Sequence, residues 1–198
     1  VLIKTLPDNS VITLNKNSRL SYKKSFNEKD RHVTLSGEAF FNIAADKSKP
    51  FEIRVDDVTV TVVGTSFNIK NNKEGTEVIV ETGIVAVALK NKSVKLLSGE
   101  RIFIPKNTQQ LLVQPNHDEL YTYFRTNQFI CNKTPLSQLV AALNKNYQVQ
   151  SKILNPETAG LNLTAHFSEE SLDDILQIIS QTLNVTIEHL GKDEIIIK

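Results

Sequence analysis

The sequence lacks tryptophan and methionine, and it has a single cysteine, Cys131. One cysteine excludes an internal disulfide framework and a zinc site built from several thiolates. The longest uninterrupted apolar run, Ile84 to Leu89, is far shorter than the roughly 20 residues that a membrane-spanning helix needs. Neither a disulfide-stapled scaffold nor a membrane helix is therefore expected within these residues.

An excess of charge of one sign is lacking too. The chain has 23 lysines and arginines against 22 aspartates and glutamates, a net charge of +1. It therefore has no overall positive field to attract phosphate backbones, and nucleic acid is not an expected partner. The four histidines have neither i+4 spacing nor cysteine neighbours, so no metal site and no cofactor is expected from His32, His117, His166 and His189.

A locally basic stretch lies in the first third of the chain. Apolar and acidic residues interrupt it, so a solvated strand face is expected for its members, Lys16, Arg19, Lys23, Lys24, Lys29 and Arg31. Cys131 shares its side of a strand with Phe129, which favours a buried, inert thiol.

Up to about Gln114, the hydrophobic pattern alternates with a period of two. Phe51, Ile53 and Val55 share one face of an expected strand, and the stretch 58–62 repeats the alternation. Residues 78–80, 84–89 and 102–104 are apolar at successive positions, which predicts strands that are covered on both faces. The pattern indicates an all-β domain of two sheets, either a sandwich or a flattened solenoid.

The polar, proline-containing segment 114–119 coincides with a change of period. Such a segment is typical of a domain boundary, so we expect one domain over residues 1–115 and another over 120–198.

After this boundary, two helices are expected, each with one apolar face. Thr134-Pro135 is predicted to start the first helix, and Ser168-Glu169-Glu170 the second. Their apolar residues match at a constant offset of 36, in the pairs Leu136 and Leu172, Leu139 and Ile175, Val140 and Leu176, and Leu143 and Ile179. The offset predicts a small α+β domain with a duplicated βαβ unit, Phe124 to Ile153 and Leu161 to Ile187, closed by Ile195 to Ile197.

Several short motifs in the first hundred residues occur in a specific order. They are Leu-Pro-Asp at 6–8, Arg-His-Val-Thr-Leu-Ser-Gly-Glu-Ala-Phe-Phe at 31–41, Pro-Phe at 50–51 and Val-Gly-Thr-Ser-Phe-Asn at 63–68. Together they resemble the FecR domain, the periplasmic part of a bacterial anti-sigma factor. Asn9 stands where this family usually has a turn glycine; asparagine also tolerates positive φ.

From Tyr123 onward, the chain resembles the domain that follows FecR domains in many such proteins. Phe129, Leu136, Tyr147, Leu176 and residues 195–197 stand at its motif positions. This second domain is similar to the secretin and TonB short N-terminal fold. The family's tryptophan before this domain is absent, and Tyr123 or Phe124 is expected in its place.

The resemblance implies a mechanism and a location. Such proteins hold an extracytoplasmic-function sigma factor with a cytoplasmic segment, cross the inner membrane once and present a periplasmic region. An outer-membrane TonB-dependent transporter offers its signalling domain to this region, and regulated proteolysis then releases the sigma factor. Val1 opens directly on a strand-like pattern, so we expect the chain to be the periplasmic fragment of such a longer protein.

The partner site is expected in the C-terminal domain, where an exposed sheet edge can accept a strand by backbone pairing. We expect the last strand, with Ile195, Ile196 and Ile197, to be that edge.

The dipeptide Gly64-Thr65 has two interpretations. Some FecR-type proteins resemble self-processing proteins that cleave between these residues, and a hydroxyl can attack the preceding carbonyl if a base is close. The alternative is a glycine bulge between two strands. No base can be identified from the sequence, so we expect a signalling module and not an enzyme. A carbohydrate-binding β-sandwich is a further alternative, although it would need exposed aromatic side chains.

Overall fold

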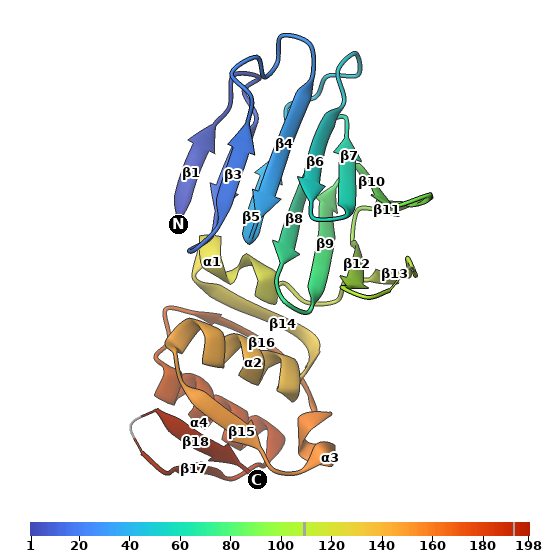
Figure 1. Ribbon diagram of the computed structural model, residues 1–198. Helices are drawn as coiled ribbons and strands as arrows, with labels where there is room; N and C mark the ends of the chain where they lie inside the picture. The colour runs from blue at the N-terminus through green and yellow to red at the C-terminus, as the bar shows by residue number, and fades with distance from the viewer. Residues whose placement is uncertain (109, 192) are drawn as a thin grey trace. The chain divides into compact units, whose positions relative to one another are not determined.

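The structure is a computed structural model that describes residues 1–108, 110–191 and 193–198. The chain forms two compact units, Val1–Asn116 and His117–Lys198, shown in Figure 1. The first consists of β-sheets and the second is a small α+β unit, so the predicted fold class is confirmed. The division falls inside the polar segment where the period of the sequence changes.

Two sheets make up the N-terminal unit. The first has the order β1-β2-β5-β8-β9-β12-β13, with the bounds β1 (Leu2–Thr5), β2 (Val11–Leu14), β5 (Glu38–Asn42), β8 (Ser66–Asn71), β9 (Gly75–Thr82), β12 (Glu100–Pro105) and β13 (Val113–Pro115). The second has the order β11-β10-β7-β6-β4-β3, with β3 (Arg19–Tyr22), β4 (Arg31–Ser36), β6 (Phe51–Val55), β7 (Val58–Val62), β10 (Ile84–Leu89) and β11 (Lys92–Leu97).

The strand numbers run without reversal along each sheet. The chain therefore crosses between the sheets every one or two strands while it advances along them. The sequence does not distinguish a two-sheet sandwich from a flattened solenoid. In this unit both terms apply, because the chain winds between two packed sheets.

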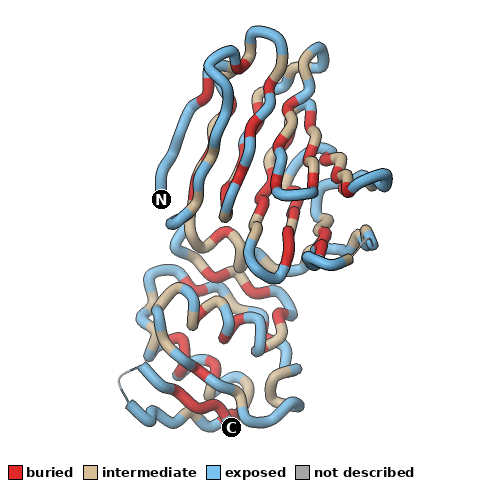
Figure 2. Tube along the Cα trace, in the orientation of Figure 1, coloured by how far each residue is buried: buried red, intermediate tan, exposed pale blue. Residues whose placement is uncertain are grey.

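A continuous hydrophobic core lies between the two sheets. Inward residues alternate with outward ones along the strands, as the red and pale blue segments of the upper strands in Figure 2 show. On β6, for example, Phe51, Ile53 and Val55 are fully buried while Arg54 is exposed. This alternation is what the period of two in the sequence predicts.

The prediction that three apolar runs are covered on both faces is wrong for two of them. All of Val78, Ile79 and Val80 are buried, but Ile84 is 53% exposed and Phe103 is 41% exposed. On β10 and β12 only one face of the strand packs on the core, so the apolar residues of the other face remain in contact with solvent.

The C-terminal unit contains the predicted duplication. Its first copy is β14 (Gln128–Pro135), α2 (Leu136–Tyr147) and β15 (Gln150–Ile153), and its second is β16 (Asn162–Ser168), α4 (Leu172–Leu183) and β17 (Ile187–His189). The short elements η1 (Leu120–Thr122) and α1 (Tyr123–Thr126) precede the first copy, α3 (Pro156–Ala159) links the copies, and β18 (Glu194–Ile197) ends the unit.

The two copies exchange strands. β14 pairs with β16 in a two-stranded sheet, while β15 and β17 both pair with β18 in a three-stranded one. In the first sheet Ile130 lies opposite His166, its equivalent at the offset of 36. The copies therefore pair antiparallel about a local pseudo-two-fold axis.

The helices bury the apolar faces that the sequence predicts, but they start later than expected. Pro135 is the N-cap of α2 and has no side-chain cap, because the Thr134 hydroxyl accepts from the backbone of Asn132. Helix α4 is capped by Ser171, which forms a capping box with Asp174.

Candidate functional site

The strand expected to be the docking edge is not an edge. β18 lies between β15 and β17, and Ile195, Ile196 and Ile197 are buried. The reason is physical: three consecutive isoleucines need cover on both faces, and a central strand gives it. The edge strands of the C-terminal unit are β14, β15, β16 and β17.

The outer edge of β14 is covered by its own chain. Three of its outward backbone groups have local hydrogen-bond partners: Gln128 N donates to Thr126 Oγ1 at 3.2 Å, Ile130 O accepts from Glu119 N at 2.9 Å, and Asn132 N donates to Thr134 Oγ1 at 3.1 Å. This edge of the first copy is therefore partly covered, which makes it less available for pairing.

The outer edge of β15 is covered at Ser151 by one side chain of α2. Gln150 N and Leu154 N donate towards β18, so Ser151 between them presents its backbone outward. The side chain of Asn144 hydrogen-bonds both backbone groups of Ser151: Ser151 N donates to Asn144 Oδ1 at 2.8 Å, and Asn144 Nδ2 donates to Ser151 O at 2.9 Å. The amide of Asn144 thus takes the place of a neighbouring strand.

The outer edge of β17, in the second copy, has no such cover. Thr186 and Lys198 form two backbone hydrogen bonds with each other. In an antiparallel pair of strands, every second residue points its backbone groups away from the neighbouring strand. The N–H and C=O groups of Ile187 and His189 therefore point away from β18. None of these four groups has a hydrogen-bond partner within the described part of the chain.

β16, also in the second copy, presents a longer edge. Leu136 N donates to Leu161 O, so the odd-numbered residues of β16 are those whose backbone groups point towards β14. Thr164 and His166 therefore point their backbone groups outward, and no described residue pairs with these groups. We call the outward edges of β16 and β17 the open edges.

The duplication explains why the two copies differ. The equivalent of Asn144 is Ser180, and the equivalent of Ser151 is Ile187. The Ser180 hydroxyl is too short to reach a neighbouring edge and instead donates to Val185 O at 2.6 Å. The first copy is thus partly covered at both strands, whereas the outward groups of Thr164, His166, Ile187 and His189 in the second copy have no partner among the described residues.

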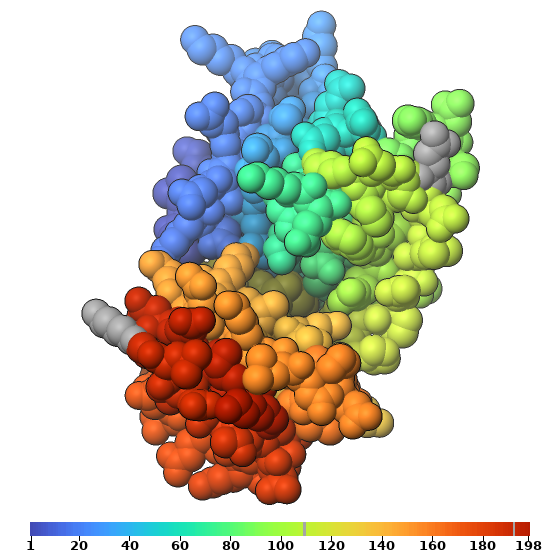
Figure 3. All heavy atoms as spheres, turned by 60° about the horizontal axis from the view of Figure 1, so that its bottom comes forward, coloured from blue at the N-terminus to red at the C-terminus, as the bar shows by residue number. Residues whose placement is uncertain are grey.

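The two open edges are not equal. β17 has only three residues, and a short edge strand is a poor template for pairing, whereas β16 has seven residues. Moreover, β16 contains no lysine, arginine or proline, the residues that usually protect edge strands. Figure 3 shows the second copy, in orange to red, on the surface of the C-terminal unit. Of the two, β16 is the better receptor for an added strand.

The motifs of the N-terminal unit meet at one buried side chain that the sequence did not single out. Arg31, expected on a solvated strand face, is 1% exposed. Its guanidinium pairs with Asp8 at 3.1 Å and donates to the carbonyl oxygens of Ala44 at 2.8 Å, Lys49 at 2.6 Å and Val63 at 3.4 Å. The expectation is wrong because partners distant in the sequence enclose this residue.

Asp8 completes this cluster from the Leu-Pro-Asp turn. Its Oδ2 accepts from Ser10 Oγ at 2.7 Å as well as from Arg31, and Asn9 adopts φ 66°. The turn, the run that begins at Arg31 and the segment at Val63 are thus held together. These motifs have a structural explanation in the N-terminal unit.

Gly64 and Thr65 lie between β7 and β8. A Cβ atom on Gly64 would lie 2.6 Å from the Cβ of Ala45, so the close approach of the chain explains this glycine. The Thr65 side chain is buried, and its hydroxyl has no hydrogen-bond partner in the part of the chain that the structure describes. No base is therefore positioned against this hydroxyl.

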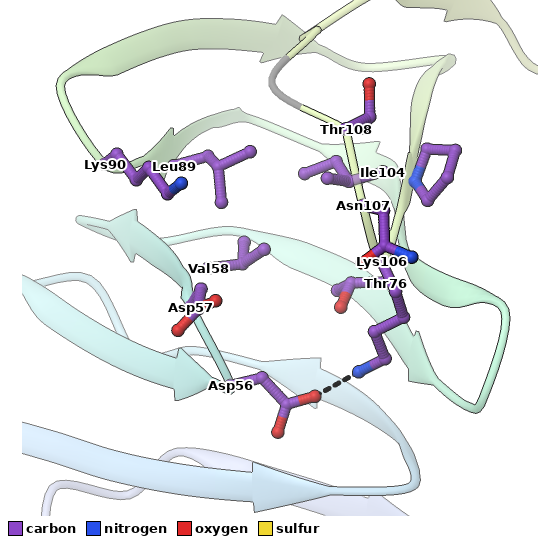
Figure 4. A pocket seen from close by; sticks show the side chains of 11 residues that line it. Asp56, Asp57, Val58, Thr76, Leu89, Lys90, Ile104, Lys106, Asn107 and Thr108 are labelled. Carbon is purple, nitrogen blue, oxygen red and sulfur yellow. Dashed lines mark hydrogen bonds and ion pairs between the residues drawn. The ribbon is translucent and has the colours of Figure 1, made fainter.

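A cavity of about 320 Å³ opens at one end of the sandwich, between the β6–β7 turn, the β10–β11 turn and the segment after β12, as Figure 4 shows. At its rim Lys106 pairs with Asp56, and the hydrogen bonds from Lys106 and Asn71 lower the pKa of Asp56. Val58, Leu89 and Ile104 add apolar side chains to its lining. None of the described residues that line it is aromatic, which does not favour a sugar as ligand.

The remaining candidates do not form a site. Cys131 is buried, and its burial together with the charge of Asp118 raises the pKa of its thiol to about 11. Within residues 1–108, 110–191 and 193–198, no three histidine, cysteine, aspartate or glutamate residues lie close enough to hold a metal ion. Of the described helices, none has the length and the apolar character required to span a membrane.

Comparison with known proteins identifies the family. The family model described as "FecR protein" matches residues 4–86, and that described as "FecR, C-terminal" matches residues 128–197. No curated protein matches the chain.

Two crystal structures of a protein from Parabacteroides distasonis ATCC 8503, assigned as an anti-sigma factor, are similar over both units. One, at 1.65 Å resolution, has a TM-score of 0.76 and 28% identity, and covers 100% of this chain and 93% of that chain. The other, at 2.50 Å, has a TM-score of 0.74 and 28% identity over 99% and 92%. The chain therefore belongs to the FecR family of anti-sigma factors.

Proposed function

We propose that the chain is the periplasmic signal-relay region of a single-pass inner-membrane anti-sigma factor. Its C-terminal unit receives the signalling domain of an outer-membrane TonB-dependent transporter. The contact controls an extracytoplasmic-function sigma factor that a cytoplasmic segment of the same protein holds. The FecR family is regulatory and not a class of enzymes, which supports this role.

The observation that carries the proposal is the unequal cover of the two copies. A partner that adds a strand needs a row of outward N–H and C=O groups, and the second copy presents such rows on β16 and β17. Because β16 is longer and lacks the usual protecting residues, the partner strand pairs with β16 at Thr164 and His166. The partial cover of β14 and β15 favours docking on the second copy.

A matched pair of substitutions tests this docking mode. His166→Pro and His189→Pro each remove one outward N–H, on β16 and β17, without removing an inner ladder bond. Isothermal titration with the signalling domain of a transporter encoded beside this protein should give binding about tenfold weaker for His166→Pro. Binding by His189→Pro should equal that of the unchanged chain. The opposite order would assign docking to β17, and no binding by the unchanged chain would contradict the proposal.

The self-processing alternative has its own test. Since no base lies against the Thr65 hydroxyl, the purified chain should remain one species in intact-mass measurement. Two fragments that meet between Gly64 and Thr65 would restore the alternative.

A further inference from the structure

A pocket of about 320 Å³ lies in the C-terminal unit beside the end of β16. Its lining comes from α1 and the residue after it, from β14, from the end of α2, from β16 and α4, and from the residues that join these two elements. The residues that matter for its chemistry are Tyr123, Phe129, Tyr147, Phe167, Glu169 and Glu170. The volume is at the small end of ligand sites, of the order of 300 to 1,000 Å³, and suits one side chain or a small molecule.

The walls of the pocket are aromatic. Tyr123 stacks on Phe129 with ring centroids 4.0 Å apart, and Tyr147 lies 6.3 Å from the same ring. The Tyr147 hydroxyl donates to the backbone oxygen of Glu170 at 3.0 Å, which ties the helix end to the acidic segment. Burial, and after it the neighbouring Tyr123 and Glu170, raises the pKa of Tyr147, so this hydroxyl remains a neutral donor.

The rim of the pocket is acidic and lacks a counter-charge. Glu169 and Glu170 line the pocket, and among the described residues no lysine, arginine or histidine does. Oxygen Oε2 of Glu170 is buried and has no hydrogen-bond partner among the described residues. A buried carboxylate oxygen without a donor is unfavourable, so a cationic donor at this position would be bound.

Aromatic faces and a carboxylate oxygen together select an organic cation. The π-face of a ring attracts an ammonium or guanidinium group, and the carboxylate accepts its hydrogen bonds. We propose that this pocket binds an alkylammonium or guanidinium group, which a lysine or arginine of the docking partner supplies. The assignment of this cation to the docking partner rests on the proposed function. Phe167 belongs to β16, and Glu169 and Glu170 follow its last residue, so a strand that pairs with β16 passes beside the pocket.

The chemistry is tested on the whole chain without the partner. Nα-acetyl-lysine methylamide is titrated and the backbone amide shifts of the pocket residues are followed by NMR, with Nα-acetyl-norleucine methylamide as the neutral analogue. The lysine probe should give saturable shifts at Asn127 and Glu169, whereas the norleucine probe should give none. Glu170→Gln, which keeps the shape, should weaken the lysine probe at least about tenfold. Glu157→Gln, a change at an exposed acid of α3, should not weaken it.

Equal shifts with both probes, or unchanged binding in Glu170→Gln, would overturn the proposal. A second titration, with the transporter's signalling domain, then tests the source. Weaker binding of that domain by Glu170→Gln, and not by Glu157→Gln, supports a partner lysine or arginine, and equal binding overturns that source. If the domain fails to bind the unchanged chain while the lysine probe binds, the proposed function fails and the cation pocket stands.

Discussion

At the residue scale, Arg31 shows how the N-terminal unit is held together. One guanidinium with its five donors serves Asp8 and several backbone carbonyls that belong to distant parts of the chain. The ring of Phe51 lies 5.6 Å below its central carbon. Loss of Arg31 would leave the buried carboxylate of Asp8 without its counter-charge and the carbonyls of Ala44 and Lys49 without this donor, so the cluster has a large effect on stability.

We therefore predict that Arg31→Met lowers the free energy of unfolding by about 3 to 5 kcal/mol, the cost of leaving a buried charge unpaired. Urea denaturation followed by circular dichroism measures it. The control is Arg54→Met, at an exposed position of β6, which should change stability by less than about 0.5 kcal/mol. Similar losses in both variants would show that the Arg31 cluster does not have this role.

Cys131 allows a prediction about reactivity. Its thiol pKa is raised to about 11, so at pH 8 the folded protein holds far less thiolate than an ordinary cysteine does. Alkylation by iodoacetamide at pH 8 should be about 100-fold slower in the native protein than in urea. The rate should rise with pH through the region of 9 to 11. Fast native alkylation at pH 8 would contradict the buried placement of this thiol.

How far the sequence predicts individual residues depends on the range of their contacts. The positive φ that asparagine tolerates is local, and Asn9 indeed adopts φ 66°. The burial of Arg31 depends on Asp8 and on the carbonyls of a loop after β5, which no local pattern reveals. Likewise the aromatic and acidic pocket combines residues from α1 to α4, and only the fold brings them together.

At the scale of elements, the closed edge of β15 depends on one side chain. Asn144 makes two hydrogen bonds to the backbone of Ser151, at 2.8 and 2.9 Å. Its removal exposes this edge to water and to other strands. The same device is absent from the second copy, where Ser180 occupies the equivalent position.

We predict that Asn144→Ala costs about 1 to 2 kcal/mol of stability, since two hydrogen bonds are lost. It should also increase self-association, which analytical ultracentrifugation detects, because a further edge becomes available. Asn146→Ala is the matched control, since Asn146 donates to Ala142 O within its own helix. If Asn144→Ala left both stability and association unchanged, Asn144 would not be the residue that closes this edge.

Periodicity predicts the elements better than it predicts their order. The two strand-helix-strand units and their offset of 36 are visible in the sequence because they depend on local patterns. Strand order is not local, and for this reason the sequence-based expectation of an edge strand at β18 is wrong: β18 lies in the centre of its sheet. Its three successive isoleucines were a usable signal, since cover on both faces is typical of a central strand.

At the scale of the whole molecule, the two units differ in what they present. The motifs of the N-terminal unit are explained by its internal structure, and the cavity at its end lacks aromatic side chains. The C-terminal unit has a duplicated core, and the strand edges of its first copy are better covered than those of its second. This asymmetry is the physical basis for placing the docking function in the second copy.

Amide hydrogen exchange of the chain with and without the transporter's signalling domain tests this central claim most directly. The backbone N–H groups of Thr164 and His166 have no partner among the residues that the structure describes, so they should exchange fast in the free chain and at least about tenfold slower in the complex. Those of Ile187 and His189 should exchange equally fast in both states. Binding of the domain without slower exchange at Thr164 and His166 would contradict the account.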